Sequence, residues 1–323
     1  MTILVTGAAG FIGYHVAQAL LARGEHVVGV DNINDYYDVA LKEARLAQFA
    51  GKDGFTFVKA DISDREAMFA ISDAHPGISG IVHLAAQAGV RYSQVNPYAY
   101  IQSNVMGQVV MLEMARRLGQ LRHFVYASSS SVYGGNTEMP FSVDQRVEKP
   151  ISLYAATKRA DELISYTYAH LYGIPQTGLR FFTVYGPWGR PDMAPMLFTR
   201  AILAGEPIRV FNHGDMSRDF TYIDDIVDGV IRALDRPAEG TPPHVVYNLG
   251  NNRPEQLLDF IGSIEAATGR QAEKQLEPMQ PGDVPSTFAD IDLTREKLGY
   301  EPKTPMRVGI PKFVEWYRRH YSV

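Results

Sequence analysis

Short apolar runs alternate with helical patterns through the first half of the chain. The segments expected as strands are 2–6, 26–30, 55–59, 79–84, 122–127 and 175–181. The segments expected as helices are 11–23, 65–74, 97–118 and 151–172. This alternation is typical of a parallel sheet covered on both faces, with ligands bound at the carboxyl ends of its strands. We therefore predict an α/β fold built on a doubly wound parallel sheet.

The pattern becomes irregular beyond residue 185. Prolines at positions 187, 191 and 195 exclude a regular helix from this segment. Helices are expected again at 196–205 and 224–235, and a strand is expected at 207–211. We predict two units, a first domain over 1–185 and a smaller, mixed α/β C-terminal lobe over 186–323, with interleaved segments.

A glycine-rich turn follows the first strand, in which Gly7, Gly10 and Gly13 have the spacing G-x-x-G-x-x-G. Such glycines allow a tight turn, close approach of a ligand and close packing of helix on strand. The N-terminus of the following helix presents free N–H groups to a pyrophosphate. Asp31 ends the second strand. A carboxylate at this place accepts hydrogen bonds from ribose hydroxyls and repels a 2′-phosphate. We expect a Rossmann-type domain that binds NAD rather than NADP; an ordinary turn before an exposed aspartate is the plainer alternative.

Composition narrows the class of protein. The net charge of −5 gives no sign of attraction to nucleic acid or to a membrane. The absence of cysteine excludes disulfides and thiolate metal sites, and no metal-ligand cluster stands out. No apolar run approaches the ~20 residues that span a bilayer, and the N-terminus does not read as a signal sequence. We expect a cytoplasmic protein without a metal.

A tyrosine, a lysine and a serine-rich run form the candidate catalytic group. Tyr154 and Lys158 are four residues apart in an expected helix, so their side chains share a face. A free phenol, with a pKa near ~10, is a poor base at neutral pH, but a nearby ammonium stabilises the phenolate. The serines at 128–131 follow strand 122–127, where a hydroxyl would orient the substrate and relay its proton. A surface helix and a capping loop are the plainer interpretations.

The motifs GAAGFIG, HLAAQAGVRYS, YASSSSVYG, YAATK and SRDFTYIDD occur in this order along essentially the whole chain. In these motifs the chain resembles the extended short-chain dehydrogenase/reductases and, more narrowly, the nucleotide-sugar 4-epimerases. The resemblance implies a UDP-sugar substrate and catalytic roles for Ser129, Tyr154 and Lys158. It also implies a homodimer in which helices 97–118 and 151–172 form a four-helix bundle.

The resemblance further implies where each ligand binds. In it, Asp61 and Ile62 flank the adenine, Tyr185 lies near the nicotinamide, and Asn104 is a buried amide near the active site. The implied cofactor residues are Gly7, Gly10, Phe11, Ile12, Gly13, Asp31, Asn32, Asp61, Ile62, Leu84, Ala85, Ala86, Asn104, Tyr154, Lys158 and Tyr185. The implied substrate residues are Ser128, Ser129, Ser130, Thr183, Arg190, Arg218 and Asp283, the last in a Pro-Gly-Asp run at 281–283.

Two positions discriminate among the resembled enzymes. Ser130 and Ser131 stand where dehydratases carry an Asp-Glu pair and decarboxylases a glutamate, so chemistry confined to C4 is favoured. The segment 186–194 resembles the signature of UDP-glucuronate 4-epimerases, in which Arg190 would bind the C6 carboxylate; pairing of Arg190 with Asp192 is the alternative. The resemblance thus implies C4 epimerisation of UDP-glucuronate to UDP-galacturonate through a transient 4-keto intermediate. A UDP-glucose or UDP-N-acetylglucosamine 4-epimerase, a UDP-glucuronate decarboxylase and a non-catalytic NAD sensor remain open.

Overall fold

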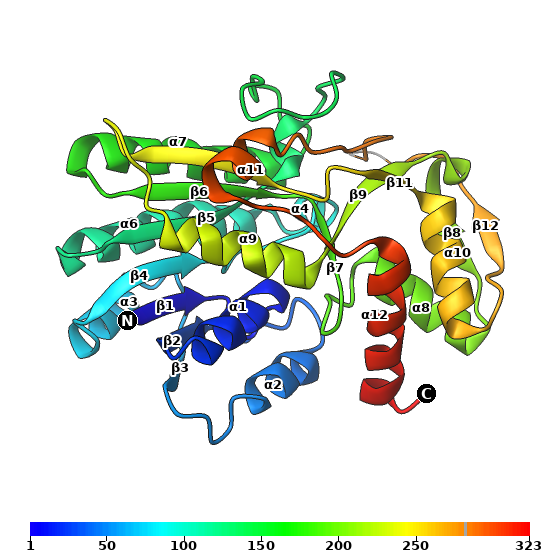
Figure 1. Cartoon of the computed structure of the whole chain (residues 1–323), viewed down its shortest axis with the longest axis horizontal. Coiled ribbons are helices and arrows are strands. Elements are labelled where there is room, and N and C mark those ends of the chain that lie inside the picture. The colour runs from blue at the N-terminus through cyan, green and yellow to red at the C-terminus, as the bar shows by residue number, and fades with distance from the viewer. Residues whose placement is uncertain (281–282) are drawn as a thin grey trace.

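Seven parallel strands form the central sheet, in the order β10-β6-β5-β4-β1-β2-β3 (Figure 1). The computed structural model describes residues 1–280 and 283–323. The strands are β1 (Thr2–Thr6), β2 (His26–Asp31), β3 (Phe55–Lys59), β4 (Ile78–His83), β5 (His123–Ser129), β6 (Gln176–Phe181) and β10 (His244–Leu249). The strand order reverses between β1 and β4, which opens a crevice at their carboxyl ends. The prediction of a doubly wound parallel sheet is confirmed.

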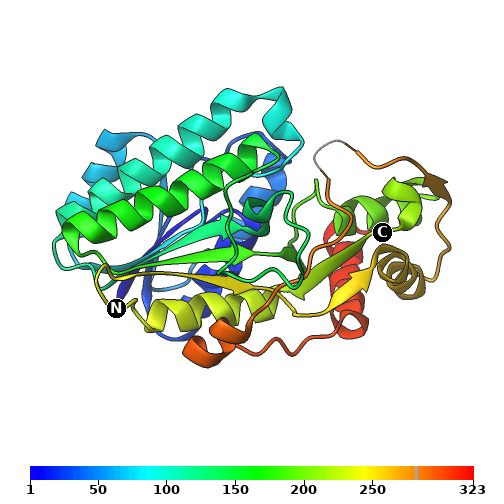
Figure 2. The same cartoon turned by 90° about the horizontal axis from the view of Figure 1, so that it is seen from above.

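Helices cover both faces of this sheet (Figure 2). On one face lie α3 (Arg65–Ala74), α6 (Gly107–Leu118) and α7 (Leu153–Tyr172), and on the other lie α1 (Phe11–Ala22) and α9 (Ile223–Asp235). The register places Leu4 opposite Val28 and Ile81 in one core, while Ile3 and Val5 lie in the other. Because side chains alternate along a strand and both faces are buried, the strand sequence is apolar throughout.

The remaining segments form a smaller lobe with mixed strand pairing. Its three-stranded sheet has β9 (Ser217–Tyr222) between β7 (Thr183–Tyr185), which is parallel to it, and β11 (Pro254–Gln256), which is antiparallel. The strands β8 (Ile208–Val210) and β12 (Lys274–Leu276) pair separately. The lobe's helices are α8 (Ala194–Ala204), α10 (Leu257–Thr268) and α12 (Met306–Tyr321), and the short α11 (Asp292–Leu298) lies near β10 and α9. The predicted mixed α/β lobe is confirmed.

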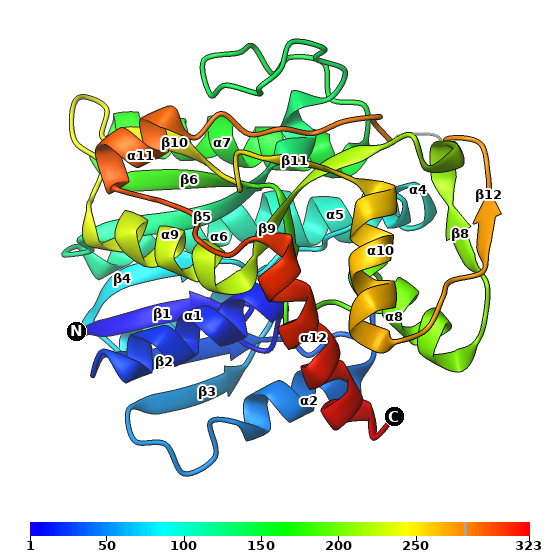
Figure 3. The same ribbon diagram turned by 45° about the vertical axis from the view of Figure 1, so that its right-hand side comes forward.

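Several elements differ from the sequence prediction. The expected helix 97–118 consists of α5 (Pro97–Tyr100), a π-helical turn over Ile101–Met106, and α6; a short α4 (Tyr92–Val95) precedes it. The helix α2 (Val39–Ala47) follows β2 and had no counterpart in the prediction (Figure 3). Strand β10 and helix α9 come from the second half of the chain and lie on the large sheet. No helix among the described residues combines the length and apolar character needed to cross a membrane.

Candidate active site

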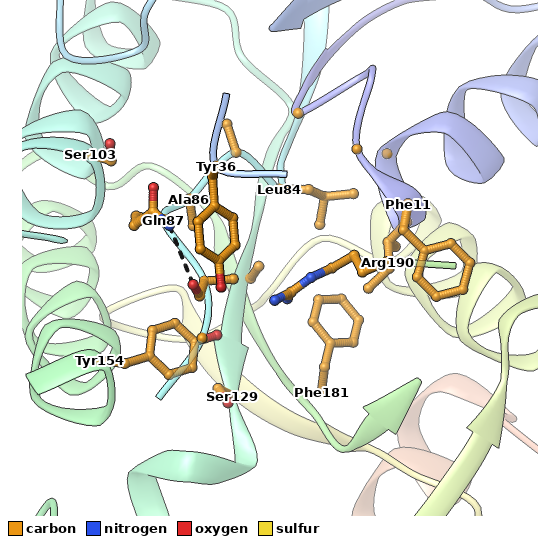
Figure 4. A pocket seen from close by; sticks show the side chains of 18 of the residues that line it. Phe11, Tyr36, Leu84, Ala86, Gln87, Ser103, Ser129, Tyr154, Phe181 and Arg190 are labelled. Atoms are coloured by element: carbon orange, nitrogen blue, oxygen red, sulfur yellow. Dashed lines mark hydrogen bonds between the residues drawn. The ribbon is translucent and has the colours of Figure 1, made fainter. Parts of the chain in front are cut away.

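A cavity of about 350 Å³ lies at the carboxyl ends of the central strands. It brings together residues that are far apart in the sequence, from the glycine turn near residue 7 to the segment after residue 186 (Figure 4). The predicted residues that line it are Gly7, Gly10, Phe11, Ile12, Gly13, Asp31, Asn32, Ile62, Leu84, Ala85, Ala86, Ser128, Ser129, Ser130, Tyr154, Lys158, Thr183 and Arg190. The cavity therefore contains most of both predicted ligand sites.

The glycine turn is tight enough to require glycine at two positions. Gly7 has a φ of 72°, and a Cβ there would lie 2.9 Å from the backbone nitrogen of Ala85. A Cβ on Gly13 would lie 2.1 Å from the carbonyl oxygen of Gly7. The turn is held to the sheet by the Gly7 N–H, which donates to the carbonyl of Val30 at 2.8 Å. This cradle at the start of α1 has the form that accommodates the diphosphate of a dinucleotide.

The Asp31 carboxylate is oriented by the backbone at the end of β2. It accepts hydrogen bonds from the Ala9 N–H at 3.1 Å and the Ile33 N–H at 2.8 Å. The next residue, Asn32, donates its side-chain amide to the Asp61 carboxylate at 2.8 Å. Asp61 itself is not among the lining residues, so the structure places it behind Asn32, which it orients.

Tyr154 and Lys158 lie on one face of α7 and both line the cavity. The Lys158 ammonium donates to the Ala127 carbonyl at 3.0 Å and to the Asp161 carboxylate at 3.1 Å. The Tyr154 ring meets Tyr100 edge-on, with ring centroids 6.1 Å apart. Burial raises the pKa of Asp161 to about 6, although the neighbouring Lys158 ammonium acts in the opposite direction. The pair thus places a carboxylate directly behind the predicted catalytic lysine.

The serines at the end of β5 have different tasks. The Ser129 hydroxyl donates to the Ser131 hydroxyl at 3.1 Å and accepts from the Ser131 N–H, at the start of a 3₁₀ helix over Ser130–Tyr133. The Ser128 hydroxyl instead donates to the buried Glu162 carboxylate at 2.6 Å. Because successive side chains of a strand point to opposite faces, only one of the two hydroxyls lies beside Tyr154 (Figure 4). Ser128 still lines the cavity, and its predicted role toward the substrate stays a prediction.

Arg190 pairs with Asp192, as the alternative interpretation expected, and also lines the cavity, so its role toward a sugar carboxylate stays a prediction. Its guanidinium donates to the Asp192 carboxylate at 3.1 and 2.5 Å. The same side chain extends into the cavity beside Tyr36 and Phe181 (Figure 4). The bonds to Asp192 come from Nε and Nη2 of the guanidinium. The Tyr36 hydroxyl also donates to Asp192, at 3.0 Å, and the nearby guanidinium helps to hold the pKa of Asp192 below its ordinary value.

Besides Asp61, two further predicted cofactor residues, Tyr185 and Asn104, lie outside the cavity lining. The Tyr185 side chain is buried in the core of the smaller lobe, with its hydroxyl against Gly309 of α12. The expectation that it lies near the nicotinamide is wrong, because β7 turns this side chain away from the crevice. Asn104 lies in the π-helical turn, where its amide accepts from the Gln87 N–H and donates to the Gln87 carbonyl and to Thr157. These hydrogen bonds are all internal, so Asn104 supports the loop that follows β4.

Arg218 and Asp283 lie in a separate charged cluster. Arg91 pairs with Asp283 at 2.8 Å and lies over the Phe211 ring. The Arg218 guanidinium donates to the carbonyls of Ser217 and Pro285. Burial lowers the pKa of Arg218. The Arg218 guanidinium also interacts electrostatically with Asp283 and Arg91. Residues 281 and 282 of the predicted Pro-Gly-Asp run lie outside the described residues, and the phosphate role of this cluster stays a prediction.

Comparison with known proteins assigns the family. The model of the NAD dependent epimerase/dehydratase family matches residues 3–250. UDP-glucuronate 4-epimerase 4 of Arabidopsis thaliana is 48% identical over 100% of this chain and 76% of its own length. The UDP-glucuronic acid 4-epimerase of Bacillus cereus, solved with UDP-glucuronic acid and NAD, is 34% identical with a TM-score of 0.92, over 99% of this chain and 100% of that one. The UDP-glucose 4-epimerase of Thermotoga maritima, solved with UDP-glucose, is 31% identical with a TM-score of 0.90, over the same shares.

The chain belongs to the NAD dependent epimerase/dehydratase family. The cavity of this epimerase/dehydratase fits the family's cofactor, because its glycine cradle leaves no room for side chains and Asp31 stands where the ribose of NAD would bind. Among the described residues, no group of three or more histidines and carboxylates is placed to hold a metal.

Sequence reasoning missed several cavity residues of this family member, four of which carry polar or aromatic side chains that bear on the site. Tyr36, Lys42, Gln87 and Phe181 line the cavity without having been predicted. The available signal for Tyr36 was the aromatic pair Tyr36-Tyr37 in the loop that follows Asp31. The other three gave none, since a lysine in a short helix, a glutamine in a loop and a phenylalanine at a strand end each have ordinary structural roles.

Proposed function

We propose that this chain is an NAD-dependent isomerase that converts UDP-glucuronate to UDP-galacturonate by C4 epimerisation, through a transient 4-keto sugar. The observation that carries the proposal is the Arg190 guanidinium, which enters the same cavity as Tyr154 and Lys158. A guanidinium binds a carboxylate through a planar fork, and a neutral sugar offers no such partner. The names of relatives that match nearly all of this chain support the same substrate: a UDP-glucuronate 4-epimerase of Arabidopsis thaliana and a probable UDP-glucuronate 4-epimerase of Rhizobium meliloti.

The residues of the site divide the work of the reaction. Bound NAD would supply the hydride acceptor for C4 and return the hydride to the opposite face. Tyr154 takes the proton from the C4 hydroxyl and later gives it back. Lys158 supplies the positive charge that favours the phenolate, and Ser129 orients the reacting hydroxyl.

The intermediate poses a particular problem for a uronic acid. Oxidation at C4 gives a β-keto acid, which loses carbon dioxide when the bond from C5 to the carboxylate aligns with the carbonyl π-system. Arg190 would hold the carboxylate out of that alignment while the sugar turns over between the two hydride transfers. Ser130 and Ser131 favour the same outcome, since neither can act as the acid or base that chemistry at C5 requires.

Product analysis tests the proposal. Purified protein incubated with UDP-glucuronate should yield UDP-galacturonate without carbon dioxide, and should leave UDP-glucose unchanged. A UDP-pentose would identify a decarboxylase, turnover confined to a neutral sugar would identify that epimerase, and bound NAD without any turnover would identify a sensor. Arg190→Leu should raise the KM for UDP-glucuronate by about 100-fold, as expected for a lost charge-assisted contact of ~3 kcal/mol. Arg190→Lys is the matched control that keeps the charge, and it should recover part of the affinity.

We also propose that two copies associate through α6 and α7 in the cytoplasm. These helices lie side by side on one face of the sheet (Figure 2). Leu163 and Tyr166 of α7 are 53% and 50% exposed, and Met106, just before α6, is also exposed, so an apolar surface remains uncovered in the single chain. Light scattering should give twice the chain mass for the wild type and the chain mass for Leu163→Glu. A monomeric wild type contradicts the dimer, and a fluorescent fusion tests the location.

A further inference from the structure

A buried arginine on α2 makes no salt bridge with any described carboxylate. Arg45 is 0% exposed and ranks among the largest fully buried side chains. Its five N–H groups all donate hydrogen bonds, and every acceptor is neutral. The acceptors are the carbonyls of Trp188 (3.2 and 2.7 Å), Gly189 (3.2 Å) and Ala9 (2.9 Å) and the hydroxyl of Tyr37 (2.8 Å).

These acceptors belong to three segments that meet only in the folded protein. Ala9 lies in the glycine turn of the dinucleotide cradle, and Tyr37 lies in the loop after Asp31. Trp188 and Gly189 lie in the segment 186–192, here named the strap, which also carries Arg190. One guanidinium therefore joins both walls of the cofactor site to the segment that presents Arg190 to the cavity.

The strap is held by a second side chain as well. The His15 imidazole of α1 lies 2.9 Å from the Pro187 carbonyl. Burial lowers the pKa of His15 to about 4, so the neutral ring donates its Nε2–H to this carbonyl at neutral pH. Three consecutive carbonyls of the strap, at 187, 188 and 189, are thus bound by side chains of α1 and α2. Without these donors they would be left unpaired in a region that is closed to water.

The conformation of the strap requires such support. Trp188 has a φ of 64°, in the left-handed region that side chains other than glycine rarely adopt. Its ring packs against Tyr14 of α1 and against Trp316 and His320 of α12. Figure 3 shows α12 running down beside α2, so the strap passes through the place where the two lobes meet. A loss of the anchoring bonds would let the strap relax and would displace Arg190.

We propose that Arg45 is a positioning residue whose planar fork keeps Arg190 in register with the dinucleotide cradle and keeps that cradle in the form that retains the cofactor. Lysine would not replace it, because an ammonium has three donors and lacks the planar fork. The effect on the sugar carboxylate rests on the proposed function, whereas the effect on the cofactor does not.

Arg45→Lys tests the proposal, because it keeps the charge and removes the fork. Folding is checked by circular dichroism and by thermal melting. The expected result is release of NAD at least ten times faster than from the wild type, together with a roughly ten-fold higher KM for UDP-glucuronate and little change in kcat at saturating NAD and substrate. If Arg45 only supports the fold, its replacement should lower the melting temperature without raising KM selectively over kcat. Arg23→Lys is the matched control, since Arg23 is partly exposed, pairs with Asp235 and is not among the cavity-lining residues.

A second variant keeps the proposal testable if Arg45→Lys does not fold. His15→Phe preserves an aromatic ring and removes the donor to Pro187, and it should shift NAD release and KM in the same direction by a smaller factor. Wild-type NAD release in the variant that folds overturns the cofactor part of the proposal. In the double variant Arg45→Lys/Arg190→Leu, the KM for UDP-glucuronate should be no higher than in Arg190→Leu alone. If the two single-variant increases in KM multiply instead, Arg45 does not act through Arg190, and that part of the proposal is overturned. If the wild type does not turn over UDP-glucuronate, the proposed function fails while the NAD-release experiment still decides the role of Arg45.

Discussion

A methyl group on Gly13 should separate folding from cofactor binding. The Cβ of Gly13→Ala would lie 2.1 Å from the Gly7 oxygen, 2.7 Å from the Gly7 carbonyl carbon and 3.3 Å from the Ala8 Cα. All three atoms belong to the backbone of the turn, and none can rotate away. Ordinary contact begins near 3.4 Å, so the turn and α1 must move apart by about 1 Å.

The magnitude follows from the hydrogen bonds that such a shift would break. The N–H groups at the start of α1 bind a diphosphate only at ~2.9 Å, and a shift of about 1 Å removes them from range. The loss of two such bonds at ~1.5–3 kcal/mol each weakens NAD binding by about 10²- to 10⁴-fold. The strain in the turn adds about 1–3 kcal/mol of lost stability, which a domain of this size can tolerate.

The assay is the amount of NAD released per chain when purified protein is denatured, with thermal melting as the test of folding. Gly262→Ala on α10 is the matched control, because a Cβ there meets nothing within 4 Å. The control should keep wild-type NAD content and gain up to about 1 kcal/mol from helix propensity. Gly13→Ala protein that purifies with a full complement of NAD would refute the reasoning.

Three further predictions concern acids and bases. Tyr154→Phe should lower kcat by about 10³-fold or more while bound NAD is retained, and near-normal turnover would exclude this phenol as the base. Asp161→Asn removes the carboxylate 3.1 Å from Lys158, so the acid limb of kcat/KM should move to lower pH by about one pH unit, and an unmoved limb contradicts this. Burial raises the pKa of Asp219 from 3.8 to about 6, so its contribution to stability is present below 3.8 and lost as pH rises through 6. Relative to Asp219→Asn, the wild type should therefore lose up to about 3 kcal/mol of unfolding free energy over this range in urea titrations, and a constant difference is the contrary result.

The large sheet and the core of the site follow from local sequence signals. Apolar runs of strand length alternate with helical patterns, and the glycine spacing predicts the cradle without knowledge of the fold. The four-residue spacing of Tyr154 and Lys158 places them on one helix face by geometry alone. The resemblance to known epimerases added the substrate, which the local patterns do not contain.

The sequence prediction was wrong where a side chain could have faced either the cavity or the core. Tyr185 ends the three-residue strand β7, and the register that turns its side chain from the cavity depends on pairing with the distant strand β9. A tyrosine suits both the apolar core of the smaller lobe and a polar cofactor site. The residue type at position 185 therefore favours neither placement.

The chain's own sequence determined most of the strands and helices, the glycine cradle and which phenol shares a helix face with which ammonium, because each depends on residues close together in the chain. Only the tertiary structure decided that Arg45 lies beneath the strap and that Arg190 reaches the cavity. Those contacts join residues about 140 positions apart, and their acceptors are backbone carbonyls, which every residue carries and no sequence pattern marks.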